Sequence, residues 1–511
     1  MRIRSMTLGF GSEPSEPLSR RIHAAAHALL AAAPTGATDV VPGYTTLMLE
    51  WDENRIEPHE HQGWIESGER YAGGDDVENA ETRSAEVRTI RVRYDGEDLA
   101  GVAARTELTL DEVIAQHSAP EYLVHALGFS PGFPFLGPLP EVLQLPRRGT
   151  PRTSVPAHAV AIAGAQTGVY PMASPGGWHL LGTALDALYD PHREPPFLLS
   201  PGDRVRFQPA KGETPKEIRT LPLLPEEPSR PVFEVLDPGL LDVIVDQGRE
   251  RVGRFGLARG GPVDSAAARH ANRLVGNRAE APLLEINLSG PTLRVLADVV
   301  VAFSGLGVVP YRGRDALDPD TTHRLQRGDQ LSFGPASRGM RGYLAIAGGI
   351  ESATFLGSAS TDMRGRIGRP LHAGDVLGAS RPSFARSGFS VPAWRPRSHT
   401  TDPVIVRILP GPQACAEALD ALTLRPFRVA SADRMGVRLD GPSVPGGEVP
   451  SEGTPLGAIQ VTSDGQPLVL LHDRGSLGGY AKPAIIDPGD LPAIAQARPG
   501  QAIKFVPRSL A

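Results

Sequence analysis

Ten charged, amide and aromatic residues stand out because their types and settings suit the binding of a small anion. Five of them lie close together in a stretch dense in glycine and proline: Arg147, Arg152, Gln166, Tyr170 and Trp178. Proline and glycine fix rigid loops, and fixed donors beside aromatic rings are what an anionic, partly apolar small molecule requires. Alternatively, these arginines and the tryptophan only pack the loops against the body of the fold.

The other five lie in the second half of the chain and are all charged: Asp246, Arg249, Asp433, Arg434 and Lys482. Charged groups set among glycines are costly unless they are paired or bind a ligand. The Gly-Gly-Tyr turn beside Lys482 lets backbone N–H groups and an ammonium approach a carboxylate or phosphate together. A second interpretation stays open, in which the aspartates and arginines are turn caps and ion pairs at the corners of the fold.

Several common catalytic motifs are missing from the sequence. Ser476 lies in a GSLGG segment, but no placed lysine or His–Asp pair identifies it as a nucleophile. There is no GxxxxGK phosphate loop and no MKM-type biotin attachment site. The histidines have no HExxH or comparable spacing, so we expect no metal ligands among them.

Composition narrows the class of protein. The 511 residues carry a formal net charge of -6, which gives no electrostatic reason to expect nucleic acid. One cysteine, Cys415, excludes an intrachain disulfide and fits a reducing compartment. No apolar run reaches the ~18 residues that span a bilayer, and residues 20–33 read as an amphipathic helix rather than an export signal. We therefore expect a cytoplasmic protein without membrane segments, and homo-oligomerisation stays open.

The elements that position these residues are predicted to be mostly strands. With 57 glycines and 50 prolines, the chain favours many short strands joined by tight turns. One signature, a turn with glycine followed by an alternating strand, recurs around four residues, Gly202, Gly328, Gly374 and Gly500. Such strands commonly close a barrel and remove its free edge. The fold class is therefore mainly β with minor α, built from β-barrel modules.

A few helices and two linkers complete this organisation. Residues 110–117 follow a Thr109 cap, and residues 264–275 begin with an Asp264 cap. The Pro-rich stretch 209–231 divides the chain into two modules, and 381–403 is a second linker or a loop inside the second module.

The first module resembles a known family. Its segments GFSPGFPFLGPLP, PRRGTPRTSVPAHAV and QTGVYP with SPGGW are similar to the pattern of allophanate hydrolase subunit 1, a family that is also called the B subunit of 5-oxoprolinase. The resemblance covers about residues 39–209. His158-Ala159 and Gly137-Pro138 depart from the usual Gly-Ser and Gly-Gly, and the Arg of a GRT motif is missing after Gly182, which removes one potential anion ligand.

The second module resembles the companion family. Segments such as VLDPGLLDVIVDQGRERVGRFG, RGYLAIAGGI and LHDRGSLGGYAK are similar to allophanate hydrolase subunit 2, or the C subunit of 5-oxoprolinase, over residues 233–507. The usual TTGGY reads Ser476-Leu477-Gly478-Gly479-Tyr480 here, and the loss of two hydroxyls removes possible ligand contacts.

The resemblance implies cyclophilin-like β-barrels arranged in a definite order. We expect a small α+β part over residues 1–120, a barrel over 121–210, a linker over 211–231, and a second module over 232–511. The second module would hold two barrel-like lobes, at about 232–380 and 404–511.

The resemblance also implies a function. It suggests the B and C components of an ATP-dependent 5-oxoprolinase, a hydrolase that opens 5-oxo-L-proline to L-glutamate with ATP, Mg²⁺ and a separate LamB/YcsF-type A component. On the matched positions we assign catalytic roles to Asp246, Asp433, Arg434 and Lys482, and substrate binding to Arg147, Arg152, Gln166, Tyr170, Trp178 and Arg249. The alternatives are a biotin-dependent carboxyltransferase component, as in urea carboxylase, and a non-enzymatic regulator of a sensor histidine kinase.

Overall fold

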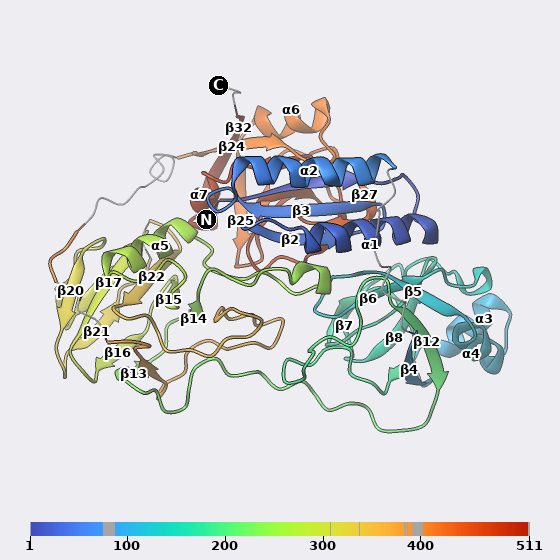
Figure 1. Ribbon diagram of the computed structural model, residues 1–511, viewed down its shortest axis with the longest axis horizontal. Coiled ribbons are helices and arrows are strands. Elements are labelled where there is room, and N and C mark those ends of the chain that lie inside the picture. The colour runs from blue at the N-terminus through green and yellow to red at the C-terminus, as the bar shows by residue number, and fades with distance from the viewer. Residues whose placement is uncertain are drawn as a thin grey trace.

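The computed structural model describes residues 2–74, 87–306, 308–336, 338–382, 385, 387–390 and 402–508. Most of the predicted second linker, residues 381–403, lies outside these described residues. Strands dominate, so the mainly β prediction is confirmed, and two groups of strands form closed barrels. Figure 1 shows the first barrel, a second β lobe and the C-terminal barrel as three bodies, with the N-terminal helices beside the C-terminal barrel.

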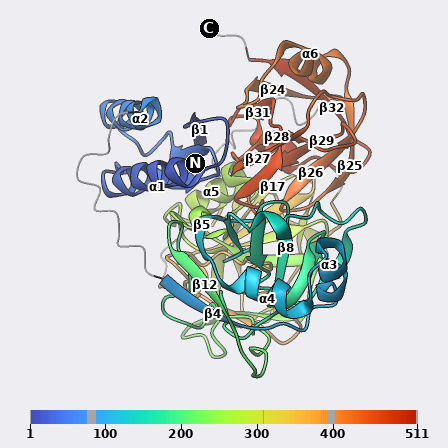
Figure 2. The ribbon, with the colours of Figure 1, turned by 90° about the vertical axis from the view of Figure 1, so that its right-hand side faces the viewer.

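The N-terminal part is a three-stranded antiparallel sheet with two helices. Its elements are β1 (Ile3–Gly9), α1 (Glu16–Ala31), β2 (Ala37–Pro42), β3 (Thr46–Asp52) and α2 (Pro58–Gly73), with strand order β1-β3-β2. Helix α1 confirms the amphipathic helix expected at 20–33, because Ile22, Ala25 and Leu29 are buried against the sheet. This layer packs beside the C-terminal barrel rather than standing apart from it (Figure 2).

The first barrel closes through seven strands, in the order β11-β4-β12-β5-β6-β9-β8. Their bounds are β4 (Val87–Arg93), β5 (Glu121–Leu127), β6 (Pro134–Gly137), β8 (Ala159–Ala163), β9 (Gln166–Val169), β11 (His179–Ala184) and β12 (Arg204–Pro209). Beside it lie α3 (Leu99–Thr106), α4 (Leu110–Ser118), η1 (Glu141–Leu143), β7 (Arg152–Val155) and β10 (Ser174–Gly176). The barrel thus takes strand β4 from inside the range 1–120 that the sequence assigned to the N-terminal part.

The second module begins with a lobe of two sheets around one core. The six-stranded sheet contains β19 (Asp315–Ala316), β18 (Pro310–Arg312), β21 (Gln330–Phe333), β16 (Thr292–Val295), β13 (Pro231–Asp237) and β23 (Val376–Gly378). The five-stranded sheet contains β14 (Leu241–Val245), β15 (Leu283–Asn287), β22 (Arg341–Ile346), β17 (Val299–Gly305) and β20 (Thr322–Leu325), and η2 (Gly253–Phe255) and α5 (Ser265–Leu274) complete the lobe.

The C-terminal barrel repeats the seven-stranded plan of the first. Its order is β24 (Val404–Pro410), β31 (Ala484–Ile486), β28 (Ala458–Val461), β29 (Pro467–Leu470), β26 (Gly436–Asp440), β25 (Phe427–Ala432) and β32 (Ala502–Pro507). A separate hairpin, β27 (Glu448–Gly453) with β30 (Leu477–Tyr480), and helices α6 (Ala416–Leu424) and α7 (Leu491–Ala495) flank it.

The four glycines of the recurrent signature lie in turns, as the sequence predicts. All four glycines have positive φ, from +85° at Gly500 to +96° at Gly328. The strands after Gly202 and Gly500, β12 and β32, each close a barrel through one parallel and one antiparallel neighbour. The strands after Gly328 and Gly374 instead lie in the six-stranded sheet.

The two predicted helix caps are also present. Thr109 forms a capping box with Glu112 at the start of α4, and the Asp264 carboxylate accepts the N–H of Ala267 at 3.0 Å at the start of α5. Both caps depend on residues within three positions, which is why the local pattern predicts them.

The segment between the modules is extended yet packed. Figure 1 shows it running along the lower edge of the molecule. Leu223 is 3% exposed and joins Tyr189, Leu257 and Ile367 in one apolar cluster. The Leu221 N–H donates to the carbonyl of Arg366 at 2.8 Å, so this linker is attached to the second module.

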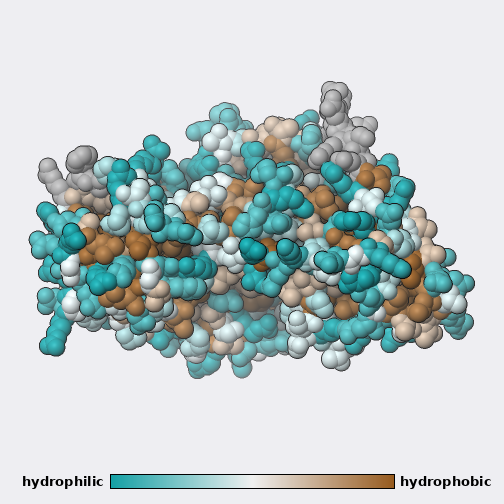
Figure 3. Space-filling view, turned by 90° about the horizontal axis from the view of Figure 1, so that it is seen from below, coloured by the Kyte–Doolittle hydropathy of each residue, from teal (hydrophilic) through white to brown (hydrophobic). Residues whose placement is uncertain are grey.

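Hydrophobic residues on the lower face occur in several small patches separated by hydrophilic ones (Figure 3). Among the described residues, none of the helices has both the length and the apolar character that crossing a membrane requires.

The closing strand offers a test of barrel stability. Phe207 on β12 is 1% exposed, and its ring stacks on His117 with centroids 4.6 Å apart. We expect Phe207→Ala to lower the free energy of unfolding by about 3–5 kcal/mol, because it leaves a cavity in the barrel core. Urea unfolding measures the loss; Gln208→Ala, at the exposed neighbouring position, is the control and should leave the midpoint unchanged.

A buried carboxylate predicts a pH dependence of stability. Asp242 on β14 is 1% exposed, and burial raises its pKa from 3.8 to about 7. The folded state therefore holds this proton more tightly than the unfolded state, so stability is greatest below pH about 4 and falls as pH rises to about 7. Asp242→Asn should flatten this fall, because the amide oxygen can still accept the Gly239 N–H.

The measurement compares unfolding midpoints at pH 4 and pH 8 for wild type, Asp242→Asn and the exposed control Asp237→Asn. An equal fall in all three proteins would refute the assignment to Asp242.

Candidate functional site

Three of the five predicted binding residues of the first barrel lie at one cluster of aromatic rings. Tyr170 and Trp178 are 2% and 6% exposed, and each packs edge to face on Phe133 with centroids 5.0 and 5.6 Å apart. Arg147 is exposed, and its charge acts on the phenols of Tyr44 and Tyr170. The predicted combination of fixed aromatic rings and a cation therefore exists at this end of the barrel.

The remaining two residues of this group, Arg152 and Gln166, lie at loops and turns of the barrel. Arg152 donates to Asp98 at 2.9 Å and also pairs with Glu97, while Arg148 donates to the same Asp98 oxygen at 2.9 Å. Although burial opposes its ionisation, Asp98 has a lowered pKa because both arginines and the Leu180 N–H stabilise the carboxylate. Gln166 stands at the turn between β8 and β9, paired with Ala163.

The carboxylate of Asp246 accepts hydrogen bonds from nearby residues of its own module. Its carboxylate accepts the hydroxyls of Ser358 and Ser360 at 2.5 and 2.7 Å and the N–H of Ala359 at 2.7 Å. It also accepts the N–H of Gly248 at 2.8 Å. These bonds tie the end of β14 to residues 358–360.

Arg249 is deeply buried and only partly paired. It is 1% exposed, donates to the carbonyl of Ser360 and lies 5.9 Å from the centre of the Phe355 ring. Its Nε and Nη1 make no hydrogen bond within the described part of the chain. Burial lowers its pKa, and Asp362 and Asp246 oppose that shift.

Arg434 is neutralised inside the molecule. It donates to the two oxygens of Asp473 at 2.8 and 3.0 Å, to the Gly261 carbonyl at 2.9 Å, and to Glu285. Burial disfavours its charge, but the two carboxylates outweigh burial and raise its pKa. Its neighbour Asp433 is exposed and caps a turn by accepting the N–H groups of Met435 and Gly436.

Lys482 is also paired. It is fully buried, and its Nζ lies 2.9 Å from Glu452 and donates to the Tyr480 carbonyl at 2.9 Å. Gln413 donates to the same Glu452 oxygen at 2.8 Å. Burial lowers the pKa of Lys482, and Glu452 opposes the shift.

The ten residues therefore fall into three separate settings. Arg147, Tyr170 and Trp178 accompany the aromatic cluster; Arg152, Asp246, Arg434 and Lys482 have their charges satisfied by neighbours. Asp433, Gln166 and Arg249 belong to turns or to the buried interior.

The aromatic cluster is where both modules meet, and we name it the junction site, defined by Tyr44, Phe129, Arg147, Tyr170 and Leu477. Leu477 of β30 belongs to the same apolar cluster as Tyr44 and Tyr170. Gly128 lies so close to Leu477 that a Cβ at this position would be 2.5 Å from the Leu477 side chain. Phe129 lies 6.2 Å from the Tyr170 ring and has a left-handed backbone, with φ +64°.

Sequence reasoning assigned neither Tyr44 nor Leu477 to a site, and it considered Ser476, which precedes Leu477, only as a nucleophile without a partner. The Tyr44 hydroxyl and the Ser476 hydroxyl are both buried without a hydrogen bond in the described part of the chain, whereas the Tyr44 N–H donates to the Ser451 carbonyl at 3.1 Å. The sequence carried no signal that these two residues come together, because the turn carrying Tyr44 and the loop carrying Ser476 are far apart along the chain.

The junction site combines donors with apolar rings. Burial raises the pKa of Tyr170 to about 12 and raises that of Tyr44 further, so both phenols keep their protons at neutral pH. Arg147, beside them, makes no ion pair among the described residues. An uncompensated guanidinium, two protonated phenols and aromatic walls suit a small carboxylate with an apolar ring.

No three His, Cys, Asp or Glu side chains of the described residues lie together in a way that could hold a metal ion.

Two family models match the chain. The model described as carboxyltransferase domain, subdomain C and D, matches residues 2–199. The model described as carboxyltransferase domain, subdomain A and B, matches residues 255–507. Together the matches confirm the family resemblance that the motifs indicated.

Relatives repeat this division. Over 211 residues the chain is 39% identical to the B subunit of 5-oxoprolinase from Bacillus subtilis, covering 40% of this chain and 88% of that one. It is 34% identical to the C subunit of 5-oxoprolinase from Escherichia coli over 293 residues, covering 55% of this chain and 92% of that one. A urea amidolyase of Lachancea kluyveri is 34% identical over 54% of this chain, but the chain spans only 17% of its length.

A solved structure covers both halves at once. The crystal structure of TTHA0988 superposes with a TM-score of 0.93 at 54% identity, over 99% of this chain and 100% of that one. The fused arrangement of the two modules is therefore shared with another protein.

The ion pair between Lys482 and Glu452 can be tested through its effect on the stability of the fold. Lys482→Met should lower the free energy of unfolding by about 3–5 kcal/mol, because it leaves Glu452 buried without its cation. Adding Glu452→Gln to that variant should restore part of the loss. The measurement is urea unfolding, with the exposed Lys211→Met as control; a single variant as stable as wild type would contradict the ion pair.

Proposed function

Because the chain belongs to the carboxyltransferase-domain family and joins regions similar to the B and C components of 5-oxoprolinase, we propose that it supplies both components of an ATP-dependent 5-oxoprolinase. In this proposal a separate LamB/YcsF-type A component completes the opening of 5-oxo-L-proline to L-glutamate.

The observation that carries the proposal is the junction site, to which both halves contribute. The turn after β2 supplies Tyr44, the first barrel supplies Arg147 and Tyr170, and the second module supplies Leu477. A site assembled from two modules needs both in fixed proportion, which one polypeptide provides. This favours a shared site over two modules that act separately.

The substrate fits the groups that the junction site presents. 5-Oxo-L-proline carries one carboxylate, a lactam carbonyl and a small apolar ring. Arg147 would bind the carboxylate, while the phenols of Tyr44 and Tyr170 would donate to oxygens on which negative charge develops. Phe129 and Trp178 would wall the ring.

The proposed reaction balances with two water molecules. Transfer of the γ-phosphoryl group from ATP to the lactam oxygen breaks the bond to the β-phosphate oxygen and releases ADP. One water then adds to the lactam carbon, the ring C–N bond breaks and the nitrogen takes a proton; a second water releases phosphate and leaves glutamate. Mg²⁺ would enter with ATP as part of the substrate, and no step is assigned to a metal held by the described residues.

The other predicted site residues take positioning roles in this proposal. Arg152, Asp246, Arg434 and Lys482 hold loops through bonds to neighbouring carboxylates, hydroxyls and backbone groups. To bind an anionic substrate, any of these cations would have to leave a partner carboxylate unpaired, which is costly in a buried setting.

A biotin-dependent carboxyltransferase is the second candidate. It is favoured by the descriptions of both family models and by the similarity to urea amidolyase over half of the chain. This function would require a biotin carrier and a biotin carboxylase on other proteins.

One assay separates the two candidates. The purified chain is mixed with its A-type partner, ATP, Mg²⁺ and 5-oxo-L-proline, and glutamate and ADP are measured. We expect glutamate only when every component is present, and Arg147→Gln should lower kcat/KM by about 10²-fold, equivalent to the ~3 kcal/mol of a charge-assisted contact.

The exposed Arg105→Gln is the matched control and should retain full activity. No glutamate from any mixture, together with carboxyl transfer from carboxybiotin, would replace the first candidate by the second. Full activity of Arg147→Gln would remove the junction site from either reaction.

A further inference from the structure

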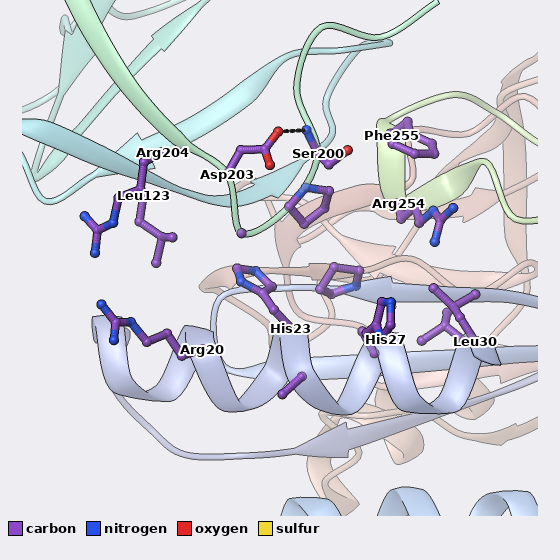
Figure 4. Close-up of a pocket in the computed structure, with 16 residues that line it drawn as sticks. Arg20, His23, His27, Leu30, Leu123, Ser200, Asp203, Arg204, Arg254 and Phe255 are labelled. Atoms are coloured by element: carbon purple, nitrogen blue, oxygen red, sulfur yellow. Dashed lines mark hydrogen bonds between the residues drawn. The ribbon is translucent and has the colours of Figure 1, made fainter. Parts of the chain in front are cut away.

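A cleft separate from the junction site lies where three parts of the chain meet. Its volume is about 450 Å³, and it is lined by helix α1, by residues 200–203 and the first residue of strand β12, Arg204, and by Arg254 and Phe255 of η2. Figure 4 shows side chains from α1 facing those of the barrel loop and of η2 across the cleft. We name it the α1 cleft. None of the ten predicted site residues lines it.

The α1 cleft lies on the other side of strand β2 from the junction site. Val40 and Pro42 line the cleft, whereas Val41 belongs to the aromatic cluster with Tyr170. Successive side chains of a strand point to opposite faces, so β2 separates the two places. A molecule in the α1 cleft would not touch Tyr170.

One end of the cleft has an excess of positive charge. Arg20 and Arg204 face each other there (Figure 4), and both pair with the single carboxylate of Glu16, Arg20 at 2.6 Å. Arg20 remains largely exposed, at 65% of its side chain. Two guanidinium groups on one carboxylate leave one positive charge for an anion.

The other end holds a cation on an aromatic ring. Arg254 lies 4.8 Å from the centre of the Phe255 ring and makes no ion pair or hydrogen bond in the described part of the chain; its buried Nε has no acceptor. The carboxylate that attracts it, Asp39, already accepts the N–H groups of Gly253 and Val40 at 2.7 and 2.9 Å. Burial lowers the pKa of Arg254, so its guanidinium would gain from an anionic partner.

Two histidines and an apolar wall lie between the charged ends. His23 and His27 stand one helical turn apart and both point into the cleft (Figure 4). His23 Nε2 donates to the His125 carbonyl at 2.9 Å, which leaves Nδ1 facing Gly202, where a Cβ would lie 3.2 Å away. The remaining lining is largely apolar and includes Leu30, Val40, Leu123 and Phe255. Asp203 also lines the cleft, and its carboxylate accepts the Ser200 N–H at 2.9 Å.

We propose that the α1 cleft binds an organic phosphate of nucleotide size, with its phosphates at Arg20 and Arg204 and its apolar, planar part against Phe255 and Leu30. Cations at both ends demand an anion, and arginine favours phosphate because its planar group donates two hydrogen bonds at once. The volume lies in the range that encloses a drug-sized molecule and far exceeds what a lone phosphate fills.

Such a ligand would bridge the two modules. It would contact α1 and the first barrel at one end and η2 of the second module at the other. Because it binds only the assembled arrangement, it would stabilise the contact between the modules by mass action. This inference does not rest on the proposed function, because the site is distinct from the junction site.

Isothermal titration calorimetry with ADP on the full chain tests the proposal. We expect ADP to bind, and Arg20→Gln to weaken binding by about 10-fold through loss of one charge-assisted contact to phosphate. Arg254→Gln should weaken binding by about 10-fold as well, because the planar guanidinium on Phe255 would no longer contact the planar part of the ligand. Arg105→Gln should leave binding unchanged. Adenosine and inorganic phosphate, used as separate probes, should each bind at least about 10-fold more weakly than ADP.

Four results would overturn it. These are no heat of ADP binding at millimolar concentration, ADP binding that Arg254→Gln leaves intact, phosphate binding as tight as ADP, and ADP binding lost in Arg147→Gln, which would assign the nucleotide to the junction site. Arg20 is largely exposed, so Arg20→Gln keeps the test valid even where Arg254→Gln fails to fold.

Discussion

The ion pair between Glu50 and Arg474 joins the two ends of the chain. These residues stand 424 positions apart, lie 2.9 Å apart in space, and are 3% and 8% exposed. A buried charge without its partner costs several kcal/mol, so strand β3 and the loop before β30 must be folded together. Neighbouring backbone bonds, from Arg251 to Thr38 and from Gly253 to Asp39, extend the same contact. The N-terminal sheet and the second module therefore form one structural unit.

This contact is what creates the junction site. The turn between β2 and β3 passes so close to the C-terminal hairpin that a Cβ on Gly43 would lie 2.9 Å from the Cα of Glu452. The next residue, Tyr44, then lies against His125 and Phe135 of the first barrel, with ring centroids 5.3 and 6.0 Å apart. A single turn thus contacts the first barrel and the β27–β30 hairpin beside the C-terminal barrel. The buried ion pair, the hydrogen bond from the Tyr44 N–H to the Ser451 carbonyl and the apolar contact of Leu477 together hold this turn against the C-terminal hairpin.

Sequence patterns predicted the features that depend on near neighbours. The turn glycines, the Thr109 and Asp264 caps and the closing strands β12 and β32 need only a few adjacent residues, and all are present. Partners distant in sequence could not be predicted. Arg434 pairs with Asp473 and Glu285, which lie 39 and 149 positions away. The sequence indicated that a charge among glycines needs a partner, but it could not tell a carboxylate of the protein from a ligand.

Whether a cation already pairs with a carboxylate of the protein decides where an anionic ligand can bind. Arg434 and Lys482 already have their carboxylates in the buried interior, so a ligand there would compete with bonds that are formed before it arrives. Arg147 and Arg254 have no such partner among the described residues, and each lies beside aromatic rings, Arg147 near Tyr170 and Arg254 on Phe255. An anion gains most from a guanidinium that no carboxylate has yet neutralised. Arg147 and Arg254 are therefore better placed to bind anionic ligands than Arg434 or Lys482.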